Sequence, residues 1–70
     1  MPLTMVRAGE PSVIRRIGGN EETRRFLENL GFVSGGVVTV VTETGGNLIV
    51  NVKDSRVAIG KDMANRIMVG

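Results

Sequence analysis

Glycine divides this sequence into short segments. Ten of the 70 residues are glycine, roughly twice the average share. Most of them stand singly or in pairs between apolar runs, at Gly9, Gly18, Gly19, Gly31, Gly35, Gly36, Gly45, Gly46 and Gly60. Frequent turn signals between short β-branched runs are typical of small barrels and sandwiches. The pattern therefore predicts a mainly β fold.

The length and composition of the chain exclude several classes of function. Seventy residues suffice for one small domain, which we expect to span residues 1–70. The chain contains no cysteine and no histidine. It therefore cannot form a disulfide, a zinc finger, a cysteine nucleophile or a serine–histidine triad, and we expect no enzymatic activity. No apolar run approaches the ~20 residues of a membrane span, so we expect a soluble, cytoplasmic protein.

One segment carries the start and stop signals of a helix, over about residues 21–30. Asn20 is a good N-cap residue, because its side-chain oxygen can accept a hydrogen bond from a free backbone N–H group. Glu21 and Glu22 place negative charge in the first turn, where the helix dipole favours it. Gly31 can adopt the left-handed conformation that ends a helix.

The same segment shows the side-chain spacing of a helix that packs on one face. Phe26, Leu27 and Leu30 recur at helical spacing and predict one apolar stripe. Glu21 and Arg25 are four residues apart in the order that favours an ion pair.

The remaining segments read as strands and turns. Four valines and two threonines between residues 37 and 43 predict a strand, followed by a hairpin turn at 44–47. Within the return strand, Leu48, Val50 and Val52 share one face. The full set of expected strands is 12–17, 37–43, 48–53, 56–59 and 67–69, with a tight turn at Asp54-Ser55, a single helical turn at about 61–65 and short frayed ends. This order suits a five-stranded, SH3-like, partly open barrel plugged by one helix, and an OB-fold barrel is the alternative.

Three parts of the sequence resemble the ferrous iron transport protein A family (FeoA). The most specific is the segment 27–37, Leu-Glu-Asn-Leu-Gly-Phe-Val-Ser-Gly-Gly-Val, in which a helix ends in an apolar residue and glycine before a valine-rich strand. The others are Arg7-Ala8-Gly9 and the tail 57–69, which contains a strand, a helical turn and a closing Ile-x-Val. Together they cover nearly the whole chain.

The resemblance implies an SH3-like cytosolic protein that acts beside a large membrane protein. That partner would import Fe(II) and carry a cytosolic GTP-binding domain, which would place this chain peripherally at the inner membrane through its partner. The family's fold also occurs as a C-terminal regulatory domain in metal-dependent repressors. Nothing in the family implies an enzymatic role.

Two kinds of binding site can be weighed from the residues. The seven carboxylates are dispersed along the chain, whereas a site for a hard cation needs several converging oxygens, so we expect no cofactor and at most a weak metal contact. A chain this small cannot bury all its apolar side chains, and an exposed apolar patch marks an interface. Our candidate interface is Phe32 and Val33, flanked by Arg24 and Arg25; Met5, Met63 and Met68 are further surface candidates. Arg15 and Arg16 are neighbours on a strand and should face opposite ways, so they should not line one patch.

The sequence thus favours a binding module over an enzyme. We expect a monomer or weakly self-associating accessory protein of a Fe(II) uptake system, which binds its GTPase-bearing transporter. The alternatives are a small nucleic-acid-binding barrel, because the pI is about 9.9, and a regulatory domain related to that of metal-dependent repressors. Against nucleic-acid binding, the net charge is only +2 and no aromatic platform for base stacking is evident.

Overall fold

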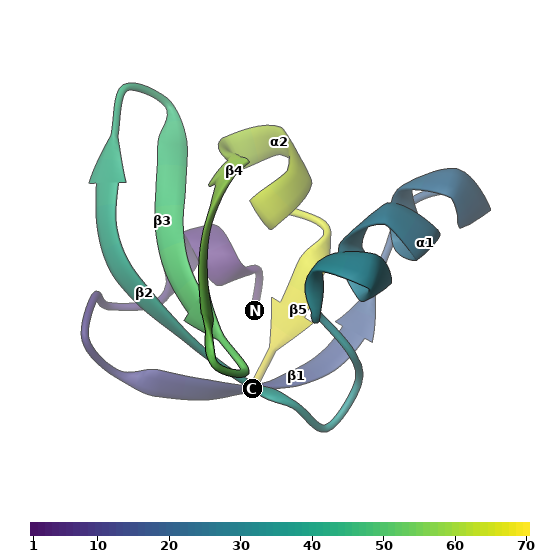
Figure 1. The fold of residues 1–70 in the computed structure, drawn as a ribbon, viewed down its shortest axis with the longest axis horizontal. Helices are drawn as coiled ribbons and strands as arrows, with labels where there is room; N and C mark the ends of the chain where they lie inside the picture. The colour runs from purple at the N-terminus through teal and green to yellow at the C-terminus, as the bar shows by residue number, and fades with distance from the viewer.

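Five antiparallel strands form one sheet in the order β4-β3-β2-β1-β5. The computed structural model describes residues 1–70. In Figure 1, helix α1 lies on the opposite side of the view from the β2–β3 hairpin. The elements are η1 (a 3-10 turn, Leu3–Met5), β1 (Pro11–Ile17), α1 (Glu21–Leu30), β2 (Val37–Thr44), β3 (Asn47–Val52), β4 (Ser55–Gly60), α2 (Lys61–Ala64) and β5 (Ile67–Val69). The prediction of a mainly β fold with five strands, one longer helix and a helical turn near 61–65 is confirmed.

Strand β1 is shared between two neighbours, and a bulge bends it. Its first half, Pro11 to Val13, pairs with β2, and its second half pairs with β5. The register shifts between Ile14 and Arg16. An extra residue in one strand breaks the alternation of side chains, so Arg15 and Arg16 are both exposed between two buried isoleucines. The expectation that these two arginines face opposite ways is therefore wrong.

Two tight hairpins connect the central strands. Gly45 and Gly46 turn β2 into β3 with φ of 55° and 84°, values that glycine adopts without strain, and the predicted turn is confirmed. Between β3 and β4, Val52 pairs with Ser55, so the turn residues are Lys53 and Asp54. The prediction of an Asp54-Ser55 turn was wrong by one residue. The turn depends on Lys53, which is the one non-glycine residue with a positive φ, 55°.

Helix α1 begins and ends at the predicted residues. The backbone N–H of Thr23 donates to Asn20 Oδ1 at 2.8 Å, which confirms the N-cap. Gly31 has φ 111° and its N–H donates to the carbonyl oxygen of Glu28, which ends the helix. Neither α1 nor α2 has the length and apolar character that a helix needs to span a membrane.

The core is a single cluster of fourteen buried apolar residues. Leu48, Val50 and Val52 all belong to it, which confirms the predicted inner face of β3. The other members are Leu3, Ile14, Ile17, Leu27, Phe32, Val38, Val40, Ile59, Ala64, Ile67 and Val69. No charged or polar residue is buried, so burial of apolar surface is the main stabilising term.

The N-terminal segment is part of this core. Leu3 is fully buried, and Pro2 forms a β-bridge with Met68. The N-terminal ammonium of Met1 donates to the carbonyl oxygen of Val69 at 2.8 Å, and Val69 N–H donates back to Met1. The expectation of a frayed N-terminus is therefore wrong, because Leu3 contributes apolar surface that the small core needs.

The substitution Leu3→Ala should lower the free energy of unfolding by about 3 kcal/mol, because it removes a fully buried side chain and leaves a cavity. Met5→Ala is the matched control in the same turn; Met5 is 67% exposed, and we expect a change below about 0.5 kcal/mol. Urea unfolding followed by circular dichroism measures both. Equal effects of the two substitutions would show that the N-terminal segment is not part of the folded core.

Candidate functional site

The structure does not bring the four predicted interface residues together at the surface. Arg24 and Arg25 are exposed on α1, but side chains that follow one another in a helix point about 100° apart. Arg25 also pairs with Glu21, 3.6 Å away, as predicted. Val33 is half-buried and Phe32 is fully buried. Phe32 therefore cannot belong to an exposed patch, and that part of the prediction is wrong.

The turn that ends α1 explains why Phe32 is buried. The N–H of Phe32 donates to the carbonyl oxygen of Leu27 at 3.0 Å, while Gly31 N–H donates to Glu28. This pair of bonds is a Schellman motif, in which the residue after the glycine commonly packs against the residue five positions earlier. Leu27 and Phe32 are both completely buried. An apolar residue directly after the helix-ending glycine was the sequence signal for this position.

The exposed aromatic residue is Phe26, which sequence reasoning placed in the apolar stripe. The helix buries Leu27 and half-buries Leu30 and Thr23, which define its inner face. Phe26 projects from the flank of that face and is 50% exposed. The predicted stripe is thus correct for the two leucines and wrong for Phe26.

Phe26 lies at a shallow hollow between α1 and α2. Glu22, Thr23 and Phe26 line it from α1, and Met63 lines it from α2. Its volume is about 240 Å³. Met63 also packs against the core cluster, so only part of its side chain faces the hollow. The lining thus combines two apolar and two polar side chains, and protein interfaces likewise combine apolar and polar contacts.

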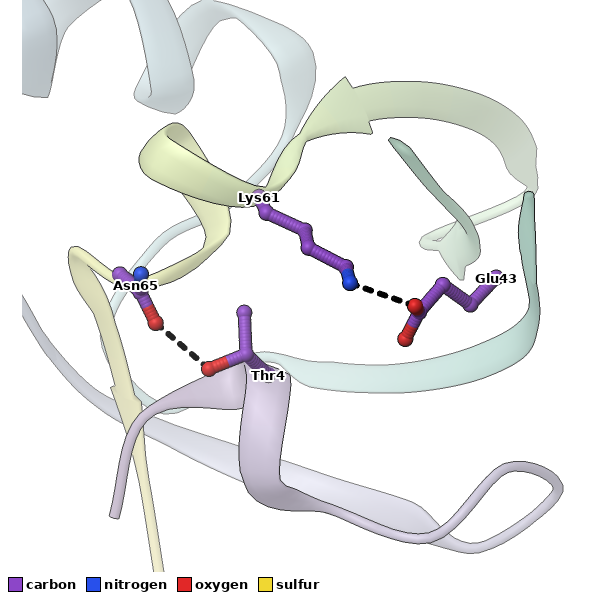
Figure 2. Close-up of polar contacts among 4 residues, drawn as sticks. All are labelled: Thr4, Glu43, Lys61 and Asn65. Carbon is purple, nitrogen blue, oxygen red and sulfur yellow. Dashed lines mark hydrogen bonds and ion pairs between the residues drawn. The ribbon is translucent and has the colours of Figure 1, made fainter. Parts of the chain in front are cut away.

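Polar contacts at both ends hold α2 in place. Figure 2 shows Lys61 at the start of α2 reaching toward Glu43 on β2, with Nζ 2.5 Å from Oε2. At the other end, Thr4 Oγ1 donates to Asn65 Oδ1 at 2.5 Å, which joins α2 to η1. Ala64, the last residue of α2, is fully buried and anchors the helix to the core. Met63, the residue before it, therefore has a defined position at the hollow.

The acidic side chains do not form a cluster of metal ligands. No group of three or more histidine, cysteine, aspartate or glutamate residues lies close enough to hold a metal ion. Glu22 is the one acidic residue at the α1/α2 hollow, and Glu43 is paired with Lys61. The hollow therefore presents apolar surface and one negative charge.

Comparison with known proteins identifies a matching family model and a curated relative. A family model described as "FeoA domain" matches residues 1–70. The curated "Putative Fe(2+) transport protein A" of Methanocaldococcus jannaschii is 29% identical over 68 residues, covering 97% of this chain and 83% of the relative.

Two solved structures share the fold over almost the whole chain. A crystal structure of an iron uptake regulatory protein (FeoA) is 30% identical with a TM-score of 0.90, covering 99% of this chain and 93% of that one. The zinc complex of FeoA from Stenotrophomonas maltophilia, described as a procaryotic SH3 domain protein possibly acting as a ferrous iron transport activating factor, is 29% identical with a TM-score of 0.87. The coverage is 100% of this chain and 89% of that one. The SH3-like prediction is confirmed over the OB-fold alternative.

The two phenylalanines should differ in their contribution to stability. Phe32→Ala should lower the free energy of unfolding by about 4 kcal/mol, because it empties a core position. Phe26→Ala should lower it by about 1 kcal/mol, because half of that ring is already in contact with water. Chemical denaturation of the two variants measures the difference. A larger loss at Phe26 would show that its ring belongs to the core.

Proposed function

Because the chain belongs to the FeoA domain family, we propose that it is a small accessory protein of a ferrous iron uptake system, which acts by binding a GTPase-bearing membrane transporter. The observation that carries the proposal is the half-exposed Phe26 beside Met63 at the α1/α2 hollow. The printed names of the relatives, which refer to Fe(2+) transport and to iron transport activation, support the assignment to iron uptake.

The exposed ring of Phe26 gives the transporter a site of attachment. Aromatic residues are enriched among the few side chains that carry most of the energy of an interface. Half of this ring is in water in the free protein, so a partner that covers it gains apolar burial. Glu22 and Thr23, which also line the hollow, can form hydrogen bonds that orient the partner.

The hollow is formed by elements whose positions are fixed before binding. Helix α1 is capped at both ends and anchored by Leu27. Helix α2 is held by Lys61–Glu43 and Thr4–Asn65. A preformed surface avoids part of the entropy cost of association, so a small contact area can suffice.

In this proposal the chain acts by changing a conformational equilibrium of the transporter. A bound protein shifts such an equilibrium only by the difference between its affinities for the two states. We infer that the affinity differs between the nucleotide-bound and nucleotide-free states of the GTP-binding region. Fe(II) is the cargo of the transporter, and the accessory chain holds no metal or other cofactor of its own. It acts as a monomer on the cytosolic side of the inner membrane, peripheral to it through the transporter.

Phe26→Ala should weaken binding to the soluble GTP-binding region of the transporter by about tenfold or more, because it removes the central apolar contact. The affinity can be measured by titration calorimetry with and without a non-hydrolysable GTP analogue. Met5→Ala is the control, because Met5 is equally apolar and 67% exposed but does not line the hollow.

Two outcomes would contradict this proposal. The first is the absence of any change in backbone amide shifts of this chain at high micromolar concentrations of the transporter region, with and without nucleotide. The second is an equal loss of affinity for Phe26→Ala and Met5→Ala. A mobility shift of DNA or RNA with steep salt dependence would instead favour the nucleic-acid alternative.

A further inference from the structure

A second hollow lies at the turn between β3 and β4. It has a volume of about 380 Å³ and contains no apolar side chain. Its lining consists of Asn51, Lys53, Asp54, Ser55 and Arg56, none of which lines the α1/α2 hollow. The lining contains two cationic side chains and one carboxylate, so it carries a net charge of +1.

Arg56 is oriented by its neighbour on the adjacent strand. Asn51 and Arg56 are paired across β3 and β4, and Arg56 Nε donates to Asn51 Oδ1 at 3.1 Å. Both ion pairs of the structure lie elsewhere, at Arg25–Glu21 and Lys61–Glu43. Because only Nε is engaged, the two terminal nitrogens of the guanidinium remain available. Their planar fork matches the two oxygens of a carboxylate.

Lys53 occupies a backbone conformation that glycine would adopt more easily. Its φ of 55° is in the left-handed region, which disfavours residues that have a Cβ. A β-carbon built at Gly31 would lie 3.6 Å from Lys53 Cδ, so the stem of Lys53 passes beside the end of α1. Backbone positions under strain are often found at functional sites. A glycine would relieve the strain at position 53 but would remove the positive charge, so we infer that the charge has a role.

The hollow is open at an edge of the sheet. Strand β4 is the first strand in the sheet order, whereas β5, at the other edge, is covered by Pro2 and Met1. None of the backbone hydrogen bonds outside the regular elements involves Ser55 or Arg56. An extended segment of another chain can therefore approach the β3–β4 turn from the side.

From these observations we propose that Lys53 and Arg56 bind one carboxylate of an acidic segment in a partner protein. The net charge of +1 matches a single carboxylate better than a phosphate dianion. Arg56 forms the bidentate contact, Lys53 adds a second positive charge, and Asn51 holds the guanidinium in position. The site is separate from the α1/α2 hollow and does not require that the partner be the iron transporter.

Hexaglutamate is a suitable probe, titrated into the full chain at low and at physiological salt. We expect shifts of the backbone amides of residues 51–56. Arg56→Gln and Lys53→Gly should each weaken binding by about threefold to fivefold, as for other exposed charge pairs. Arg16→Gln is the matched control, because Arg16 is exposed on β1 and lies outside the hollow. It should leave the affinity unchanged.

Thermal unfolding separates a binding role of Lys53 from a structural one. Lys53→Gly should unfold at a temperature no lower than the unmodified chain, because glycine relieves the positive φ. A variant that is at least as stable but binds hexaglutamate less well supports the proposal.

Three results would overturn the proposal. One is equal loss of affinity for Arg16→Gln and Arg56→Gln, which would indicate general charge attraction. Another is tighter binding of inorganic phosphate than of hexaglutamate. The third is full retention of affinity by Lys53→Gly. None of these outcomes bears on the transporter, so failure of this site and failure of the proposed function are distinguishable.

Discussion

The bend in β1 is the feature on which the rest of the structure depends. A chain of 70 residues without disulfides needs a well-enclosed apolar core, since burial of apolar surface is its main source of stability. One strand that pairs with β2 through its first half and with β5 through its second makes this possible. The bulge at Arg15 permits the change of direction, and Ile14 and Ile17 on either side of it point into the core.

Closure of this core leaves few elements free to form a binding surface. Helix α1 is attached through Leu27 and the Schellman turn, so its flank with Phe26 remains in solvent. The β3–β4 turn projects polar and charged groups only. The molecule thus has an apolar surface at the α1/α2 hollow and a cationic surface at the β3–β4 turn. Both surfaces lie on helices, strands or a tight turn. Such an arrangement fits a protein that changes a partner's behaviour by contact.

Local signals in the sequence predicted local structure well. The bounds of α1 follow from Asn20 and Gly31, whose effects act within one helical turn. The β2–β3 hairpin follows from two glycines with positive φ. Predictions that needed knowledge of a neighbouring strand were less successful. The bulge at Arg15 and the position of the Lys53-Asp54 turn depend on strand register, which is set by pairing partners far away in the sequence.

The two phenylalanines show most clearly the difference between what local sequence predicts and what packing decides. By itself, the sequence determined that the chain is mainly β, that it has one capped helix, and that it lacks the side chains of common catalytic centres. Only the tertiary structure decided that Phe32 is buried and Phe26 exposed. The physical reason is that burial depends on which elements cover a residue. Periodicity describes the faces of a helix, whereas the packing of α1 against the sheet determines which face meets water.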